Sequence, residues 1–105
     1  MISLEFFVNA CRDIYKRNLT IDIAGTNMYY AARDIRSSQI IFSNGANDPW
    51  HVLGVLRNLG ATMPALLIEG TAHCSDLYPS RTSDLPSLKS ARQYEWSVLD
   101  SWLKL

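Results

Sequence analysis

Asp48 and His73 are the two side chains of this sequence best placed to carry out acid–base chemistry together. Each follows a short apolar run that ends just before a glycine, residues 39–43 in the first case and residues 64–68 in the second. A carboxylate that accepts the Nδ1 proton of a histidine fixes the tautomer of the ring. It also stabilises the imidazolium that forms when the ring takes a proton from a serine. We therefore predict that the two residues are the acid and the base of a hydrolytic triad.

Both residues also have a purely structural interpretation. Asp48 lies in an Asn-Asp-Pro segment, where aspartate commonly hydrogen-bonds its local backbone in a turn. His73 is equally explained as a surface loop histidine beside a small apolar residue, Cys74. A second histidine, His51, directly follows Trp50 at the start of a helical stretch. We expect His51 to face solvent or to pack at the helix start rather than to pair with the acid.

The elements that must position this pair follow a strand–helix–strand pattern. Residues 39–43 and 64–68 are apolar, partly β-branched runs, typical of strands buried on both faces of a parallel sheet. Between them, residues 52–60 place apolar side chains on one face and end at a glycine, which predicts a short helix. Functional side chains of an α/β sheet lie in loops beyond the carboxyl ends of the strands, where we expect Asp48 and His73. In an α/β-hydrolase the triad acid precedes the histidine in the same order.

The segment before the first strand is predicted to begin with a helix. Residues 2–17 carry apolar side chains spaced by three and four, which indicates an amphipathic helix, with its end near Asn18. Residues 18–38 are then expected to be mostly connection, with a short helical turn around residues 29–34.

A second long helix is predicted at the end of the chain. Ser83 or Asp84 is its candidate N-cap, and Pro86 lies in its first turn. Apolar side chains recur at helical spacing and include Trp96 and Trp102. We expect this tryptophan-bearing face to pack on the sheet.

Composition indicates a single globular domain at most. The 105 residues are 48% hydrophobic and 10% aromatic, which is the range of ordinary globular chains. Ten basic and ten acidic residues are spread without long runs, so we expect neither nucleic acid nor a membrane surface as a partner. No stretch approaches the roughly 20 apolar residues of a membrane span. Residues 1–8 lack the basic start and long apolar centre of a signal peptide.

Two cysteines, Cys11 and Cys74, are too few for a disulfide framework. They are either free, partly buried thiols or a pair, and the spacing does not choose between these alternatives. A nucleophilic Cys74 activated by His73 would need adjacent loop residues to face each other, and no motif favours it.

The remaining site signals are weak. A metal site would need Cys74, His73, Asp76 and His51 to converge, but their spacing matches no recognised ligand pattern, so we expect no metal and no cofactor. Asn18-Leu19-Thr20 is a formal N-glycosylation sequon, which would be used only in a secreted protein.

Two longer motifs enclose the acid and the histidine. They are Asn-Gly-x-x-Asp-Pro-Trp at residues 44–50 and Gly-x-Ala-His-Cys at residues 70–74, and Asp-Leu-Pro-Ser-Leu follows at residues 84–88. With these motifs the chain resembles the C-terminal portion of the prolyl carboxypeptidase and dipeptidyl peptidase II family of serine peptidases, which includes the thymus-specific serine protease. The resemblance covers nearly the whole chain.

The resemblance implies specific roles for several residues. Asp48 matches the triad acid and His73 the general base, while Trp50 lies where a substrate pocket wall is expected. Cys11 matches a cysteine whose disulfide partner would lie outside this chain, and Asn18 becomes a candidate glycosylation site. Family members reside in lysosomes or outside the cell and cleave peptides that have proline near the scissile bond. Residues 1–105 would then be the C-terminal segment of an α/β-hydrolase domain, with its last two parallel strands, flanking helices and an incomplete sheet.

The chain departs from this family in one decisive respect. It contains no Gly-x-Ser-x-Gly nucleophile elbow, and Ser43 lies at a strand end rather than on a strand-to-helix turn. Without the nucleophile no acyl-enzyme forms, so we expect the chain alone to be inactive. It would be part of a longer exopeptidase whose missing N-terminal part completes the fold, or a non-catalytic binding module derived from such a peptidase. Whether a carboxypeptidase or a dipeptidyl peptidase is the parent does not follow from these residues.

Overall fold

The structure is a computed structural model that describes residues 2–32 and 34–104. The chain forms two compact units, Met1–Asp34 and Ile35–Leu105. The first unit is helical, and the second contains the strands together with Asp48 and His73. Of the described helices, none combines the length and the apolar character that crossing a membrane requires.

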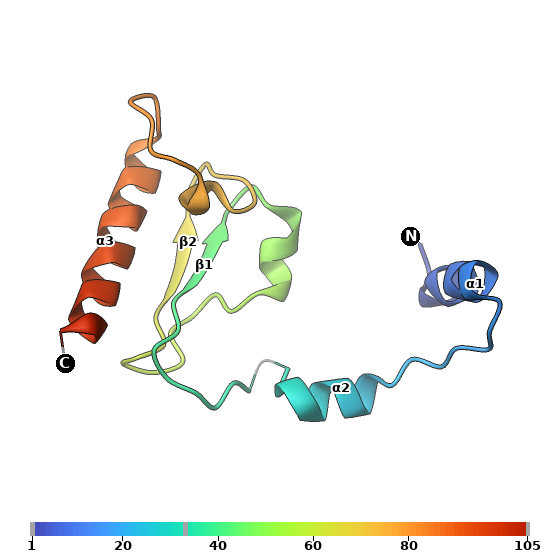
Figure 1. The fold of residues 1–105 in the computed structure, drawn as a ribbon. Coiled ribbons are helices and arrows are strands. Elements are labelled where there is room, and N and C mark those ends of the chain that lie inside the picture. The colour runs from blue at the N-terminus through green and yellow to red at the C-terminus, as the bar shows by residue number, and fades with distance from the viewer. Residues whose placement is uncertain (1, 33, 105) are drawn as a thin grey trace. The chain divides into compact units, whose positions relative to one another are not determined.

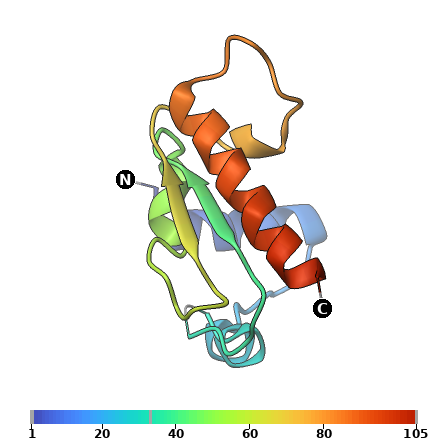
Figure 2. The same cartoon turned by 90° about the vertical axis from the view of Figure 1, so that its left-hand side faces the viewer.

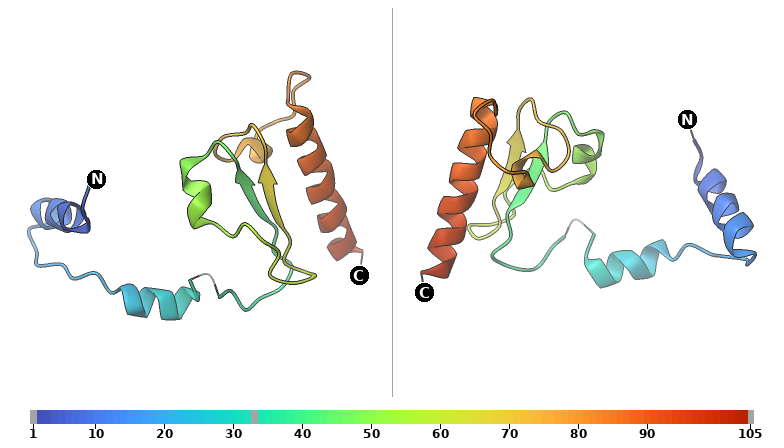
Figure 3. Two further views of the ribbon diagram at one scale, coloured as in Figure 1. Left: turned by 180° about the vertical axis from the view of Figure 1, so that it is seen from behind. Right: turned by 45° about the horizontal axis from the view of Figure 1, so that its top comes forward.

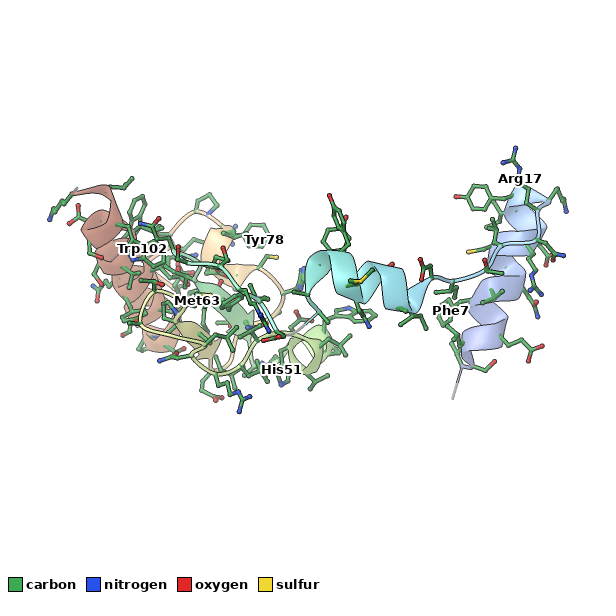
Figure 4. The ribbon with its side chains drawn as sticks, turned by 90° about the horizontal axis from the view of Figure 1, so that it is seen from below. Phe7, Arg17, His51, Met63, Tyr78 and Trp102 are labelled. Carbon is green, nitrogen blue, oxygen red and sulfur yellow. The ribbon has the colours of Figure 1, made fainter. Side chains whose placement is uncertain are left out.

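The first unit begins with α1, Leu4–Tyr15, which confirms the predicted amphipathic helix (Figure 1). Ser3 caps its start, since the Phe6 N–H donates to Ser3 Oγ at 3.3 Å. The helix ends at Lys16, which adopts the left-handed conformation, so the cap lies two residues before the predicted Asn18. None of its residues is buried within the unit; Phe7, labelled in Figure 4, is 55% exposed.

The second helix of this unit, α2, spans Ile23–Tyr30 and differs from the predicted turn at residues 29–34. It starts earlier because Asp22 caps it: the Gly25 N–H donates to Asp22 Oδ1 at 2.8 Å. It also ends earlier, because Ala31 takes a left-handed conformation that an α-helix cannot continue. The capping aspartate therefore sets the start of this helix.

The second unit is built on two parallel strands, β1, Phe42–Gly45, and β2, Ala65–Ile68 (Figures 1 and 3). Their register pairs Phe42 with Ala65 and Gly45 with Ile68, so both strands end at the same edge of the sheet. The α/β class and the parallel pairing are confirmed. The expectation of strands buried on both faces is wrong, because the sheet has two strands and Leu67 remains 44% exposed.

The connection between the strands is not the helix that residues 52–60 predicted. It begins with a 3₁₀ helix, η1, Pro49–Leu53, and then runs through an irregular segment to β2. Proline at the first position favours a helix start directly after Asp48. At Gly54 the backbone is extended, and the Asn44 side-chain amide donates to the carbonyl of the next residue, Val55, at 3.1 Å.

The last helix, α3, spans Pro86–Leu103 and confirms the predicted C-terminal helix. Figures 1 and 2 show it crossing one face of the sheet, with η1 on the other side. Leu85 is the N-cap residue rather than Ser83 or Asp84, and no side chain caps the helix.

The core lies between α3 and β2. Leu88 and Ala91 of the helix pack with Ile68 of the strand, and Leu66 is partly buried against them. The expectation that the tryptophans form this face is wrong for Trp96, which is 70% exposed, whereas Trp102, near the helix end in Figure 4, is half-buried. Of the two strands, β2 is the one that α3 contacts more closely.

Candidate active site

Asp48 and His73 come together just beyond the ends of β1 and β2. Figure 1 shows the two strands ending at the same edge of the sheet. The His73 Nδ1 atom lies 2.6 Å from Asp48 Oδ2. The carboxylate is buried, with 9% of its side chain exposed, while 70% of the imidazole side chain is open to solvent. A buried acid that orients an accessible imidazole is the arrangement that a general base requires.

Asp48 is held by its own loop. Its Oδ1 accepts the Trp50 N–H at 3.0 Å, and its own N–H donates to the Gly45 carbonyl at 3.1 Å. The pKa of Asp48 is lowered below its ordinary value, first by the hydrogen bond from His73 and next by that from the Trp50 N–H. One carboxylate oxygen therefore caps η1 and the other contacts the histidine, so Asp48 is both a turn residue and the partner of His73.

The two loops touch at Gly45, the last residue of β1. A Cβ atom added there would lie 2.6 Å from the Thr71 carbonyl oxygen and closer still to that of Ala72. The Asn47 N–H donates to this Thr71 carbonyl at 2.8 Å, which ties the acid loop to the histidine loop. The sequence marks Gly45 only as the end of a strand, whereas the structure shows that this close approach requires a residue without a side chain.

A pocket of about 200 Å³ opens beside the pair. It is lined by Ser43, Asn44, Gly45, Asp48, His73, Cys74, Asp76 and Leu77. Across it the Ser43 hydroxyl donates to Asp76 Oδ2 at 2.8 Å. The proton of Ser43 is therefore directed at a carboxylate and not at the imidazole, which argues against Ser43 as a nucleophile.

The rival histidine behaves as predicted. His51 lies in η1, labelled in Figure 4, and its Nδ1 contacts the backbone carbonyl of Asp48 at 2.6 Å rather than the carboxylate. Trp50, the candidate pocket wall, is 68% exposed and does not line the pocket. What it contributes to the acid is its backbone N–H.

Of the other candidate residues, Cys74 lines the pocket, whereas Cys11 and Asn18 belong to the first unit. Cys11 and Cys74 are both free thiols in the described structure, so they do not form a disulfide with each other. Cys11 and Asn18 are exposed on the first unit. Among residues 2–32 and 34–104, no group of three or more His, Cys, Asp or Glu side chains is arranged to hold a metal ion.

The sequence of the chain is similar to those of known serine peptidases. Residues 1–95 match the sequence model of the family described as serine carboxypeptidase S28. The chain is similar to the thymus-specific serine protease of Mus musculus, with 40% identity over 105 residues that cover 97% of the chain and 21% of the relative. For the Homo sapiens thymus-specific serine protease the identity is 45% over 83 residues, covering 79% and 16%. A lysosomal Pro-X carboxypeptidase of Bos taurus is 36% identical over 75 residues, covering 70% and 15%. The chain thus spans about a fifth or less of the length of these relatives.

Proposed function

Because this chain belongs to the serine carboxypeptidase S28 family, we propose that Asp48 and His73 are the acid and the general base of its peptidase triad. The observation that carries the proposal is the 2.6 Å contact between His73 Nδ1 and Asp48 Oδ2. In this arrangement the proton of the imidazole sits on Nδ1 and points at the carboxylate. Nε2 is then the nitrogen that takes the proton of the attacking serine and later returns it to the leaving amine.

The serine itself would come from outside these 105 residues. The chain holds no Gly-x-Ser-x-Gly motif, and the Ser43 hydroxyl is engaged by Asp76. Since the relatives are several times longer, we propose that the chain corresponds to the C-terminal part of an α/β-hydrolase domain and is inactive without the remainder. The exposed side chains of Leu67 and Trp96 support this proposal, because further strands and helices would cover them.

The substrates would be peptides, with proline next to the scissile bond. This proposal is supported by the relative named lysosomal Pro-X carboxypeptidase, which also favours a lysosome or the cell exterior as the location. In such compartments Cys11 can form a disulfide with a cysteine outside this chain and Asn18 can carry a glycan. Both residues are exposed, as these modifications require.

A chimeric enzyme tests the triad roles. Residues 1–105 replace the aligned region of the mouse thymus-specific serine protease, and hydrolysis of proline-containing peptides is measured. Asp48→Asn should lower kcat by about 10⁴-fold, and His73→Ala should lower it by about 10⁶-fold. The matched control is Asp100→Asn, because Asp100 is an exposed aspartate of α3 that pairs with Lys104 and should leave the rate unchanged.

Three results would contradict the proposal. Full activity of the His73→Ala chimera would remove His73 from the chemistry. Peptide hydrolysis by the 105-residue chain alone would show that it contains a nucleophile, and an inactive chimera that still binds proline-containing peptides would favour a binding module instead.

A further inference from the structure

The guanidinium group of Arg92, on α3, binds the segment that follows His73. Its side chain is 11% exposed. Its partners are the carbonyls of Ser75 at 2.9 Å, Asp76 at 2.9 Å and Tyr78 at 2.8 Å, the Ser80 hydroxyl at 3.4 Å and Asp84 Oδ2 at 2.6 Å. These bonds use all five N–H donors that an arginine has. The group is therefore saturated within the protein and has no donor left for a ligand.

The bound segment begins directly after the proposed base with a residue in an unfavourable backbone conformation. Cys74 has a φ of 55°, in the left-handed region that residues other than glycine rarely adopt. Such a conformation persists only where the surroundings enforce it. The Leu77 N–H closes the turn on the Cys74 carbonyl at 3.1 Å, and Arg92 binds the next two carbonyls, those of Ser75 and Asp76.

The backbone on the other side of His73 is held by the sheet. The Thr71 side chain is buried and donates to the Ile68 carbonyl at 2.8 Å, and the Thr71 carbonyl accepts the Asn47 N–H. The imidazole itself is mostly exposed, so little packing fixes it beyond its contact with Asp48. The position of the ring therefore depends on the backbone on both sides.

We propose that Arg92 is a positioning residue for His73, holding the segment after the histidine so that the imidazole meets Asp48. This inference rests on the proposed function of the pair. The planar guanidinium is suited to the task because it directs donors to several carbonyls at fixed angles. A lysine, a point charge with three rotatable donors, cannot span them. The pKa of Asp84 is lowered, first by the Arg81 N–H and then by Arg92, which agrees with a firm anchor for the guanidinium.

The test is a nitrogen-15 NMR measurement of the imidazole rings in the 105-residue protein. The wild-type His73 should show mainly the Nδ1-protonated tautomer, and Asp48→Asn should abolish this preference. Arg92→Lys keeps the charge and should lower the ratio of Nδ1- to Nε2-protonated His73 several-fold. His51 serves as an internal reference, because it lies in η1 and its Nδ1 contacts the Asp48 carbonyl.

A matched control is available on the same helix. Lys89 donates to the Thr82 carbonyl at 2.8 Å, so Lys89→Gln removes a cation and a single bond to the same segment. Its His73 spectrum should equal that of the wild type. Asp84→Asn is the second test variant; it leaves Arg92 in place but removes its anionic anchor, and should shift the His73 tautomer ratio in the same direction by a smaller factor.

The outcomes are separable. An unchanged His73 spectrum in folded Arg92→Lys overturns the inference. If Arg92→Lys does not fold, an unchanged His73 spectrum in folded Asp84→Asn overturns it instead. Unfolding of both variants would also overturn it, because Arg92 would then serve global stability. If instead Asp48→Asn leaves the wild-type spectrum unaltered, the Asp48–His73 pair itself fails, and with it the proposed function.

Discussion

The loop after β1 and the loop after β2 each supply one side chain to the pair, but they are held in opposite ways. Asp48 is buried, and the bonds that fix it come from Gly45 and Trp50, which are three and two residues away in the chain. His73 is exposed, and the residue that secures its segment is Arg92, on another element. The acid of the pair is therefore held by hydrogen bonds to neighbouring residues of its own turn, whereas the histidine depends on tertiary contacts.

The largest loss of stability should come from breaking the contact between the loop after β1 and the loop after β2. In Gly45→Ala the new methyl group would meet the carbonyls of Thr71 and Ala72, which are backbone atoms and cannot rotate away. The histidine loop must then shift, and we expect a loss of about 1–3 kcal/mol in the free energy of unfolding. Urea denaturation measures this change, and His73 should lose its Nδ1-protonated preference.

The control for this substitution is Gly60→Ala. A Cβ at Gly60 would come no closer than 3.9 Å to the end of the Met63 side chain, an ordinary contact. Its denaturation midpoint should stay near that of the wild type. A Gly45→Ala protein as stable as Gly60→Ala would show that the loops separate without cost.

A smaller effect is expected from Asp48→Asn, which separates the two roles of the carboxylate. Asparagine caps helices as well as aspartate does, so η1 should persist while the charge that faces His73 is lost. Because the pKa of Asp48 is lowered, its ionisation stabilises the fold at pH values above the ordinary 3.8. This stabilisation is lost as the pH falls through the lower pKa of the folded state.

Urea denaturation between pH 7 and pH 2 tests this assignment. Wild-type protein should lose more stability on acidification than Asp48→Asn does. Equal losses in both proteins would mean that the buried carboxylate is not coupled to the histidine in the folded state.

The smallest change in stability is expected from a substitution of Glu95, a residue of α3 close to the charge of Asp76 in the segment after His73. The pKa of Glu95 is raised by burial, and further by the nearby charge of Asp76. Its Oε1 atom is buried without a hydrogen-bond partner in the described part of the chain. Since the folded state resists ionisation, stability falls as the pH rises from the ordinary pKa of 4.5 through the raised value.

Glu95→Gln should therefore raise Tm at pH 7 by about 2–4 °C. The difference should vanish below pH 4, where the glutamate is protonated in both states. Differential scanning calorimetry at the two pH values measures it. A variant that is destabilised at pH 7 would show that the charge of Glu95 supports the Arg92 segment instead of weakening it.

The two parallel strands, the long helices and the Asp48–His73 pair all followed from residue patterns. Strand-forming runs before a glycine and helical spacing of apolar residues are local signals, and parallel pairing then places both loops at one edge. The helix predicted at residues 52–60 was wrong. The backbone is extended at Gly54, and Asn44 binds the Val55 carbonyl, a contact that apolar periodicity does not reveal. The exposure of Trp96 was not predictable from the sequence either, since burial depends on which elements are present to cover a helix face.

The residue types and their order were sufficient to predict an acid–base pair and to identify a family of serine peptidases. They were also sufficient for the cap that Asp48 provides, because its partners lie within two or three residues. The close approach at Gly45 and the role of Arg92 were decided only in three dimensions. Every residue has a backbone carbonyl, so the sequence does not indicate which carbonyls lie close to Gly45 or Arg92. The packing of α3 on β2 determines which carbonyls the arginine reaches.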